Sequence, residues 1–270
     1  MTDTCDIANC RLPIADLKIG NRKSKIENNF TLIEMMLVLV ILLFLASILM
    51  PALTRSRAQA RRTNCLSNLK QLAISLKLYS DEQKYFPDTY FKGIGSEKYY
   101  WCALDTGSSI DFKKGLMGDY VNNYNIYRCP EFEAYANVTS MDSSMKSTCS
   151  YGINAEYIGG IPDPNSAPTE NDILNSRPAK PEEIKSPDKT LTFMDSATAG
   201  GAGYTESYYF WSRYSYVTGA QHEARTHFRH FGMAAGVFCD GHAEDSLLPD
   251  AVDNKPLKIG WPDRNICGKQ

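Results

Sequence analysis

The 270-residue sequence has almost no net charge, because its 29 Lys and Arg residues nearly balance its 31 Asp and Glu residues. A nucleic-acid-binding domain usually carries a basic surplus, so the charge balance gives no support for a nucleic-acid partner. The sequence also lacks a Gly-x-Ser-x-Gly motif and a phosphate-binding loop. These absences count against serine hydrolases of that type and against nucleotide-binding enzymes of the P-loop type.

The first 29 residues contain no apolar run. Basic residues such as Arg22 and Lys23 alternate there with acidic ones such as Asp16 and Glu27. A cleavable secretory signal has an apolar core, so this segment is not an ordinary signal peptide. We interpret residues 1–29 as a cytoplasmic leader. Basic residues flank both ends of the apolar segment that follows, so charge counting alone does not give its orientation.

A long uncharged segment follows the leader. Residues 35–53 are nineteen positions without a charge, close to the roughly 20 that a helix needs to cross a bilayer. A surface helix would carry polar residues at every turn, so we predict a membrane span over about residues 32–53. Glu34 lies at its front edge, where a carboxylate costs free energy unless it is paired. The alternative role is an ordinary acidic residue in a first helical turn, which the helix dipole favours.

The residues around this span carry a resemblance to a known family. The sequence Phe-Thr-Leu-Ile-Glu at 30–34, the apolar run and Pro51 resemble the N-terminus of type IV pilins and type II secretion pseudopilins. In that family a prepilin peptidase cuts before the Phe and methylates the new amine. The resemblance implies that Phe30 is the first mature residue, that Glu34 pairs with a neighbouring subunit's N-terminal amine, and that Pro51 is the family's helix proline. The sequence departs from the family at Asn29, because the family usually has Gly before the cut.

An amphipathic pattern continues beyond Pro51. Apolar residues at spacings of four, three, four and three form one helix face: Cys65, Leu69, Leu72, Leu76 and Tyr79. We predict one long helix from about residue 31 to residue 81, kinked rather than ended by its proline. Its second half should pack on a globular domain, and we assign residues 30–85 to this helical region.

Later segments extend the resemblance to a large bacterial subfamily of pilin-like proteins whose globular domain has no known function. The helix ends in an Asn-Leu-Lys-Gln…Tyr…Phe-Pro pattern, and a His lies nine residues before an Asp-Gly pair, here His230 and Asp240-Gly241. That last pattern is associated in the subfamily with prepilin-type processing. Four further marks are Arg-Cys-Pro at 128–130, Ser-Tyr-Gly-Ile-Asn at 150–154, Ser-Pro-Asp-Lys-Thr at 186–190 and Met-Asp-Ser at 194–196.

The sequence predicts an α+β fold in which the long N-terminal helix packs on a loop-rich domain with an antiparallel sheet. We assign residues 86–250 to this domain and residues 251–270 to a surface tail. A buried strand is predicted over residues 189–195, and a β-hairpin over 236–242 with Asp240-Gly241 as a two-residue turn. The aromatic-rich segment 205–218 is either a strand or a packed loop, and the segment 159–187 is expected to be a loop.

Cysteine usage is compatible with disulfides. Of eight cysteines, Cys5 and Cys10 precede the span and six follow it. An even number on one side suits disulfide bonding if that side is periplasmic or extracellular. Cys129 and Cys149 are the favoured pair, because both flank the same loop-rich stretch. Free, buried cysteines are the alternative.

Two patterns suggest chemistry only weakly. Asp105 begins an Asp-Thr-Gly sequence, but an aspartic protease needs a second such loop, and the nearest candidate, Asp195, lacks the Gly. A hydrolase using Asp105 and Asp195 is therefore a remote alternative. No metal is predicted: the histidines have spacings that fit no zinc pattern, and the oxygen-rich loop near Asp163 lacks EF-hand spacing. The four histidines are His222, His227, His230 and His242.

The resemblance implies a non-enzymatic, cofactor-free structural subunit of a type II secretion or type IV pilus-like filament. Its implied partners are a prepilin peptidase, other pilin or pseudopilin subunits, the assembly platform and membrane lipid. The implied location is the inner membrane, with the N-terminus cytoplasmic and the C-terminal domain periplasmic or extracellular. The alternative is a cell-surface binding module that uses the helix only as export signal and anchor. In that case the aromatic stretch 208–216 would hold a polymer such as polysaccharide.

Overall fold

The computed structural model describes residues 31–133, 149–160, 177–199, 203–211 and 223–262. The chain divides into two units, Met1–Met50 and Pro51–Gln270. We call them the N-terminal unit and the main unit and describe each by itself. The predicted cleavage residues Asn29 and Phe30, together with His222, lie outside the described residues.

Helix α1 (Leu32–Gln83) begins with a capping box. The backbone N–H and the hydroxyl of Thr31 both donate to the Glu34 carboxylate, at 2.9 and 2.8 Å. The Glu34 N–H points back at the Thr31 hydroxyl at 3.4 Å, so the first-turn donors are partly satisfied by these two side chains. In the N-terminal unit every side chain from Leu32 to Met50 is exposed.

The helix is not interrupted at Pro51. Proline removes one backbone hydrogen bond but fits the helical φ angle, so the prediction that the helix continues is confirmed. In the main unit, α1 buries four of the five residues of the predicted stripe: Cys65, Leu69 and Leu72 are fully buried, and Leu76 is 3% exposed. The fifth, Tyr79, is partly buried against the same core. The helix ends at Gln83, and the next residue, Lys84, has a positive φ of 67°.

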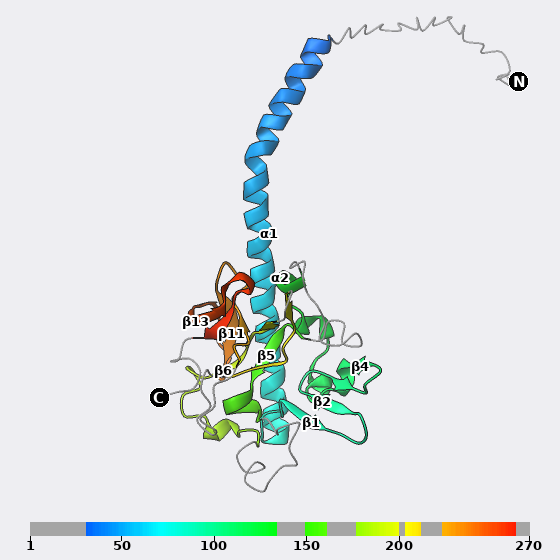
Figure 1. Ribbon diagram of the computed structural model, residues 1–270, viewed down its shortest axis with the longest axis vertical. Helices are drawn as coiled ribbons and strands as arrows, with labels where there is room; N and C mark the ends of the chain where they lie inside the picture. Colours follow the sequence, from blue (N-terminus) through cyan, green and yellow to red (C-terminus); the bar gives the residue numbers. More distant parts are fainter. Residues whose placement is uncertain (1–30, 134–148, 161–176, 200–202, 212–222, 263–270) are drawn as a thin grey trace, which may run out of the picture. The chain divides into compact units, whose positions relative to one another are not determined.

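The central sheet of the main unit has five strands in the order β12-β11-β6-β5-β9. Neighbours are antiparallel except β5 and β9, which are parallel. Every residue of β5, β6 and β11 is buried, and Figure 1 shows these strands beside the second half of α1. The strands are β5 (Tyr151–Asn154), β6 (Leu191–Asp195), β9 (Tyr209–Phe210), β11 (Ala234–Phe238) and β12 (Ala243–Leu247).

Three smaller antiparallel sheets surround this one. The first comprises β1 (Tyr90–Lys92), β2 (Lys98–Tyr100), β3 (Leu104–Asp105) and β4 (Ile110–Asp111). The second comprises β10 (Thr226–His227), β14 (Ile259–Pro262) and β13 (Pro249–Asn254), and the third β7 (Thr198–Ala199) and β8 (Tyr204–Thr205). The short helices are η2 (Phe112–Lys114), η3 (Gly118–Tyr120), η4 (Tyr124–Tyr127), α2 (Pro130–Glu133), η5 (Ala155–Gly159), η6 (Pro181–Glu183) and η7 (Lys255–Leu257).

The hairpin predicted near residues 236–242 is present, but its turn is longer than expected. The Phe238 N–H donates to the carbonyl of His242, and the Gly241 N–H donates to the carbonyl of Phe238. Three residues therefore lie between the paired positions, with Gly241 at a φ of 90°. Three-residue hairpin loops commonly combine a type I turn with a left-handed residue, and Gly is suited to that last position.

The prediction of a surface tail after residue 250 is wrong for residues 259–262. These four residues form β14, pair with both β10 and β13, and are all buried. The alternating Ile259 and Trp261 are at most 2% exposed. Gly260 lies so close to the backbone of Ala251 that a Cβ would not fit. The burial depends on partners distant in sequence, so local composition did not indicate it.

Candidate functional site

A fully buried charge cluster lies where β6 ends. Asp195, the last residue of β6, contacts Arg229 and His230 from the segment between β10 and β11. Its carboxylate accepts a hydrogen bond from the Ala235 N–H at 2.7 Å and lies 3.2 Å from His230 Nε2 and 3.4 Å from Arg229 Nε. All three side chains are at most 1% exposed. Such a buried carboxylate is tolerable only because several groups compensate it.

Arg229 also binds two backbone carbonyls. Its Nη2 donates to the carbonyls of Ser150 at 2.9 Å and of Ser196 at 3.0 Å. Ser150 immediately precedes β5 and Ser196 immediately follows β6, so one guanidinium ties the ends of two neighbouring strands. Sequence analysis missed Arg229, because only its neighbour His230 belonged to a recognised pattern.

The electrostatics of Asp195 reflect opposing effects. Burial raises the pKa of its carboxyl. The Arg229 guanidinium, His230 and the Ala235 N–H together lower this pKa by more than burial raises it, so the net pKa lies below its usual value. Asp195 is therefore ionised in the folded protein at neutral pH. The cluster is an ion pair with a supporting imidazole.

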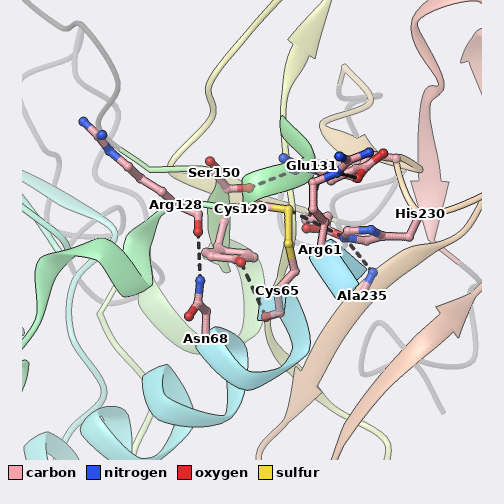
Figure 2. The surroundings of a disulfide bond; sticks show 12 residues. Arg61, Cys65, Asn68, Arg128, Cys129, Glu131, Ser150, His230 and Ala235 are labelled. Carbon is pink, nitrogen blue, oxygen red and sulfur yellow. Dashed lines mark hydrogen bonds and ion pairs between the residues drawn. A yellow bond between two sulfur atoms is a disulfide. The ribbon is translucent and has the colours of Figure 1, made fainter. Parts of the chain in front are cut away.

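A disulfide lies against this cluster. Cys65 of α1 is bonded to Cys129, which directly precedes α2, with a Cα–Cα distance of 5.1 Å. Cys129 Sγ is 3.6 Å from Nε2 of His230. Figure 2 shows the imidazole beside the sulfur atoms, with the bond joining α1 to the segment that enters α2.

The predicted Cys129–Cys149 pair is therefore wrong. Cys149 is a free, buried thiol whose Sγ donates to the carbonyl of Tyr151 at 3.1 Å. Cys65 reaches Cys129 because it lies on the buried face of α1, and nearby Asn68 Nδ2 donates to the carbonyl of Arg128 at 2.8 Å. Sequence analysis had counted Cys65 as a packing residue and not as a disulfide partner.

The structure separates the two halves of the His-x9-Asp-Gly pattern. His230 lies before β11, whereas Asp240 and Gly241 form the turn after it. An extended strand rises about 3.3 Å per residue, so the steps between the first and last of the five residues of β11 hold the two ends of the strand roughly 13 Å apart. Asp240 instead accepts hydrogen bonds from the backbone N–H and from Nδ1 of His242, at 3.0 and 2.5 Å. The His and the Asp-Gly pair of this pattern therefore lie beyond opposite ends of one strand and do not form one reaction centre.

The two aspartates of the hydrolase alternative have separate partners. Asp105 of β3 accepts a hydrogen bond from the Gly107 N–H at 2.7 Å, which makes it a turn residue. Asp195 is engaged by Arg229 and His230 in a different sheet. An aspartic protease requires two carboxylates that share a proton, and these contacts describe no such pair.

Among the described residues, one group has metal-ligand geometry: Cys65, Cys129 and His230, whose ligand atoms lie within 4.8 Å of one another. The two sulfur atoms are joined in the disulfide, whereas zinc is bound by thiolates. The arrangement therefore fits a cystine beside an imidazole better than a zinc site. The oxygen-rich residues near Asp163 lie outside the described part of the chain.

An amide-rich cleft of about 500 Å³ lies on the main unit between α1 and the segment around η4. Five of its lining side chains are carboxamides, one is a guanidinium and none is a carboxylate. Carboxamides offer both donors and acceptors without charge, so the cleft suits a neutral polar ligand. The lining residues are Asn64, Ser67, Asn68, Gln71, Asn123, Asn125, Ile126, Arg128 and Pro130.

The aromatic stretch proposed for polymer binding is engaged in internal contacts where it is described. The rings of Tyr209 and Trp211 lie 4.9 Å apart, and the Arg225 guanidinium stacks over Tyr209 at 4.4 Å. Tyr208 packs edge-on against Tyr100 at 4.4 Å. Residues 212–216 of that stretch lie outside the described part.

In length and composition, α1 is the one described helix able to cross a membrane, and its apolar window lies near the N-terminus with no part buried. Core helices of soluble proteins and signal sequences can meet the same criteria.

Comparison with known proteins gives one result. Residues 54–106 match the model of a family described as a protein of unknown function (DUF1559). No curated protein and no solved structure matches the chain. The matched stretch runs from the second half of α1 through β3 and includes Cys65 of the disulfide. Over these residues the chain is similar to that family.

Proposed function

We propose that this protein is a pilin-like structural subunit, anchored by the first part of α1 and assembled into a type II secretion or type IV pilus-like filament. The observation that carries the proposal is the segment from Leu32 to Met50, in which every side chain is exposed. Exposed apolar surface of this extent marks a membrane or protein contact. Lipid covers it before assembly, and the same segments of neighbouring subunits cover it in the filament.

The sequence around this segment supports the proposal. The Phe-Thr-Leu-Ile-Glu start resembles the prepilin cleavage motif, and the family match at residues 54–106 overlaps the Asn-Leu-Lys-Gln…Phe-Pro pattern on which the second resemblance rests. Such a subunit is polymerised by other machinery and needs no catalytic group or cofactor of its own. A disulfide in the main unit suits a periplasmic or extracellular location.

Glu34 has two separable roles in this proposal. Its carboxylate completes the capping box with Thr31, which a neutral Gln would also do. Pairing with the cationic N-terminus of a neighbouring subunit requires the negative charge as well. Charge removal and cap removal therefore test different steps.

The decisive experiment is the N-terminal sequence and intact mass of the protein extracted from its native membranes. A chain that begins at Phe30 and is heavier by one methyl group supports processing and entry into a filament. A chain that still begins at Met1 would contradict the filament proposal and leave a static membrane anchor.

The amide-rich cleft favours a second candidate function, recognition of a neutral polar polymer such as a polysaccharide. The carboxamides of Asn64 and Gln71 are exposed at this cleft. Retention on immobilised polysaccharide that is lost when both become Ala, but kept in a Trp211→Ala control, would support this function. Equal retention of the double variant and the original protein would remove it.

A further inference from the structure

An exposed aromatic side chain lies at the tip of a tight turn just before β11. The backbones of His230 and Met233 hydrogen-bond to each other in both directions, at 2.9 and 3.0 Å. The turn between them therefore has two residues, Phe231 and Gly232, and both have positive φ angles, 55° and 85°. Phe231 is 57% exposed, so the turn presents an apolar side chain to its surroundings.

The backbone conformation of this turn is unfavourable for phenylalanine. Two-residue turns with two positive φ angles favour Asn, Asp or Gly, and a bulky residue at positive φ is an outlier. Such a conformation persists only where the surrounding structure holds it. His230 does so here, because it contacts Asp195 and lies 3.6 Å from the sulfur of Cys129. Strain of this kind collects at functional sites, which makes Phe231 a candidate contact residue.

An apolar groove of about 680 Å³ lies on the main unit beyond the other end of β11. The second half of α1 contributes Ile74 and Leu78, which are both more than half exposed. Ile184, which follows η6, and Phe238, the last residue of β11, also line the groove. Exposed apolar surface gathered in a groove marks a contact site.

The turn and the groove lie beyond opposite ends of the same strand. Six residue steps separate Gly232 from Phe238, from 238 − 232, which is roughly 20 Å at about 3.3 Å per residue. Phe231 therefore does not fill the groove of its own chain. A surface residue that complements a pocket elsewhere on the same molecule makes a head-to-tail contact, and such a contact can repeat from copy to copy without closing.

We propose that the Phe231 ring of one copy inserts into the apolar groove of the next copy. This contact rests on the proposed function, because it joins neighbouring subunits of the filament. Lys70 and Lys77 also line the groove, and ammonium groups are attracted to the face of an aromatic ring. The groove therefore suits a phenylalanine ring better than an aliphatic side chain. Leu248, 62% exposed, directly follows the β12 residue that pairs with Ala234 and adds apolar surface at the same end of β11 as the turn.

The size of the contact explains why it requires a second copy that is already held nearby. A buried aromatic side chain contributes about 150–250 Å², whereas a stable interface usually buries about 1,200–2,000 Å². In the filament the exposed apolar segment of α1 provides the main attachment. Neighbouring copies held by that segment present the ring and the groove to each other at high effective concentration. The Phe231 contact then fixes the register of one main unit on the next.

Photo-cross-linking of the full chain in sheared cell-surface material tests the contact directly. Phe231 is replaced by the photoreactive analogue p-benzoylphenylalanine, the sample is irradiated, and products of twice the chain mass are digested and mapped by mass spectrometry. The expected product joins position 231 of one copy to a groove segment of another, around Ile74, Ile184 or Phe238. Dimers joined only outside the groove, or cross-links to lipid alone, would overturn the proposal. The groove is unaltered in this experiment, so the result does not depend on a groove variant that folds.

Substitutions separate this contact from the proposed function. Phe231→Asn suits the turn and should raise the melting temperature by roughly 3 °C, yet it should lower the filament yield roughly tenfold because the aromatic anchor is lost. Ile74→Glu should lower the yield similarly, whereas Ile94→Asn, at an exposed apolar residue outside the groove, should leave it unchanged. Normal yields from both Phe231→Asn and Ile74→Glu would overturn the contact and leave the filament proposal standing. Absence of filaments from the original protein would overturn both.

Discussion

Substitution of Arg229 by Met provides the sharpest test of the buried charge cluster. The change leaves the Asp195 carboxylate fully buried without its guanidinium partner and leaves the carbonyls of Ser150 and Ser196 without their Arg229 donor. Removal of one member of a buried ion pair costs about 3–5 kcal/mol. We therefore expect the free energy of unfolding to fall by about 4 kcal/mol at pH 7.

Urea unfolding followed by circular dichroism measures this loss. A change of about 4 kcal/mol shifts the denaturation midpoint by roughly 1–2 M. The matched control is Arg177→Met, because Arg177 forms an exposed ion pair with Glu183 on the surface. Exposed pairs contribute little to stability, so the midpoint of the control should not move measurably.

The pH dependence gives a check that a simple packing defect would not show. In the original protein the pKa of Asp195 is lowered, so its stabilising effect is complete above the unfolded pKa of about 3.9 and is lost as pH falls through the lower folded pKa. In Arg229→Met, burial without the guanidinium should raise that pKa above about 3.9. The deficit relative to the original protein should therefore shrink as pH falls from 7 toward about 4.

A double variant tests whether unpaired charge is the cause. Asp195→Asn combined with Arg229→Met removes both charges, and the Asn oxygen can still accept from the Ala235 N–H. It should therefore recover part of the loss seen in Arg229→Met. A double variant that is no more stable than Arg229→Met, or a pH-independent deficit, would refute the reasoning.

Three further predictions follow from the described contacts. Leu72→Ala should lower the free energy of unfolding by about 2–5 kcal/mol because it leaves a cavity under α1, whereas Ala at the exposed Ile74 should change the urea midpoint little. Cys65→Ala should lower the free energy of unfolding by about 2–5 kcal/mol, measured by the same unfolding curves, because the disulfide is lost. A loss that persists unchanged when the variant and the original protein are compared in the fully reduced state would point to packing instead. Glu34→Gln should abolish filament assembly, measured by electron microscopy of sheared cell-surface material, while retaining membrane insertion. Thr31→Ala removes the cap but keeps the charge and should still assemble, so equal failure of both variants would assign Glu34 a local role.

The elements that sequence analysis predicted correctly depend on near neighbours in the chain. The stripe from Cys65 to Leu76 follows from helical periodicity, and burial of one helix face is the usual consequence. The apolar segment before Pro51 and the hairpin after β11 are likewise encoded in short stretches. Even there a one-residue detail was missed, since the turn at Gly241 has three residues and not two.

The features that sequence analysis missed all join distant segments. The Cys65–Cys129 bond spans 64 positions, and the Asp195–Arg229 pair and the strand Ile259–Pro262 also require partners far along the chain. No local pattern specifies which cysteine lies on the right face of a helix or which cation reaches a buried carboxylate. The sequence by itself determined the apolar helix, its amphipathic continuation and the α+β class, because these follow from periodicity and composition. Only the tertiary structure decided the disulfide and the charge cluster, because packing of the whole main unit brings those side chains together.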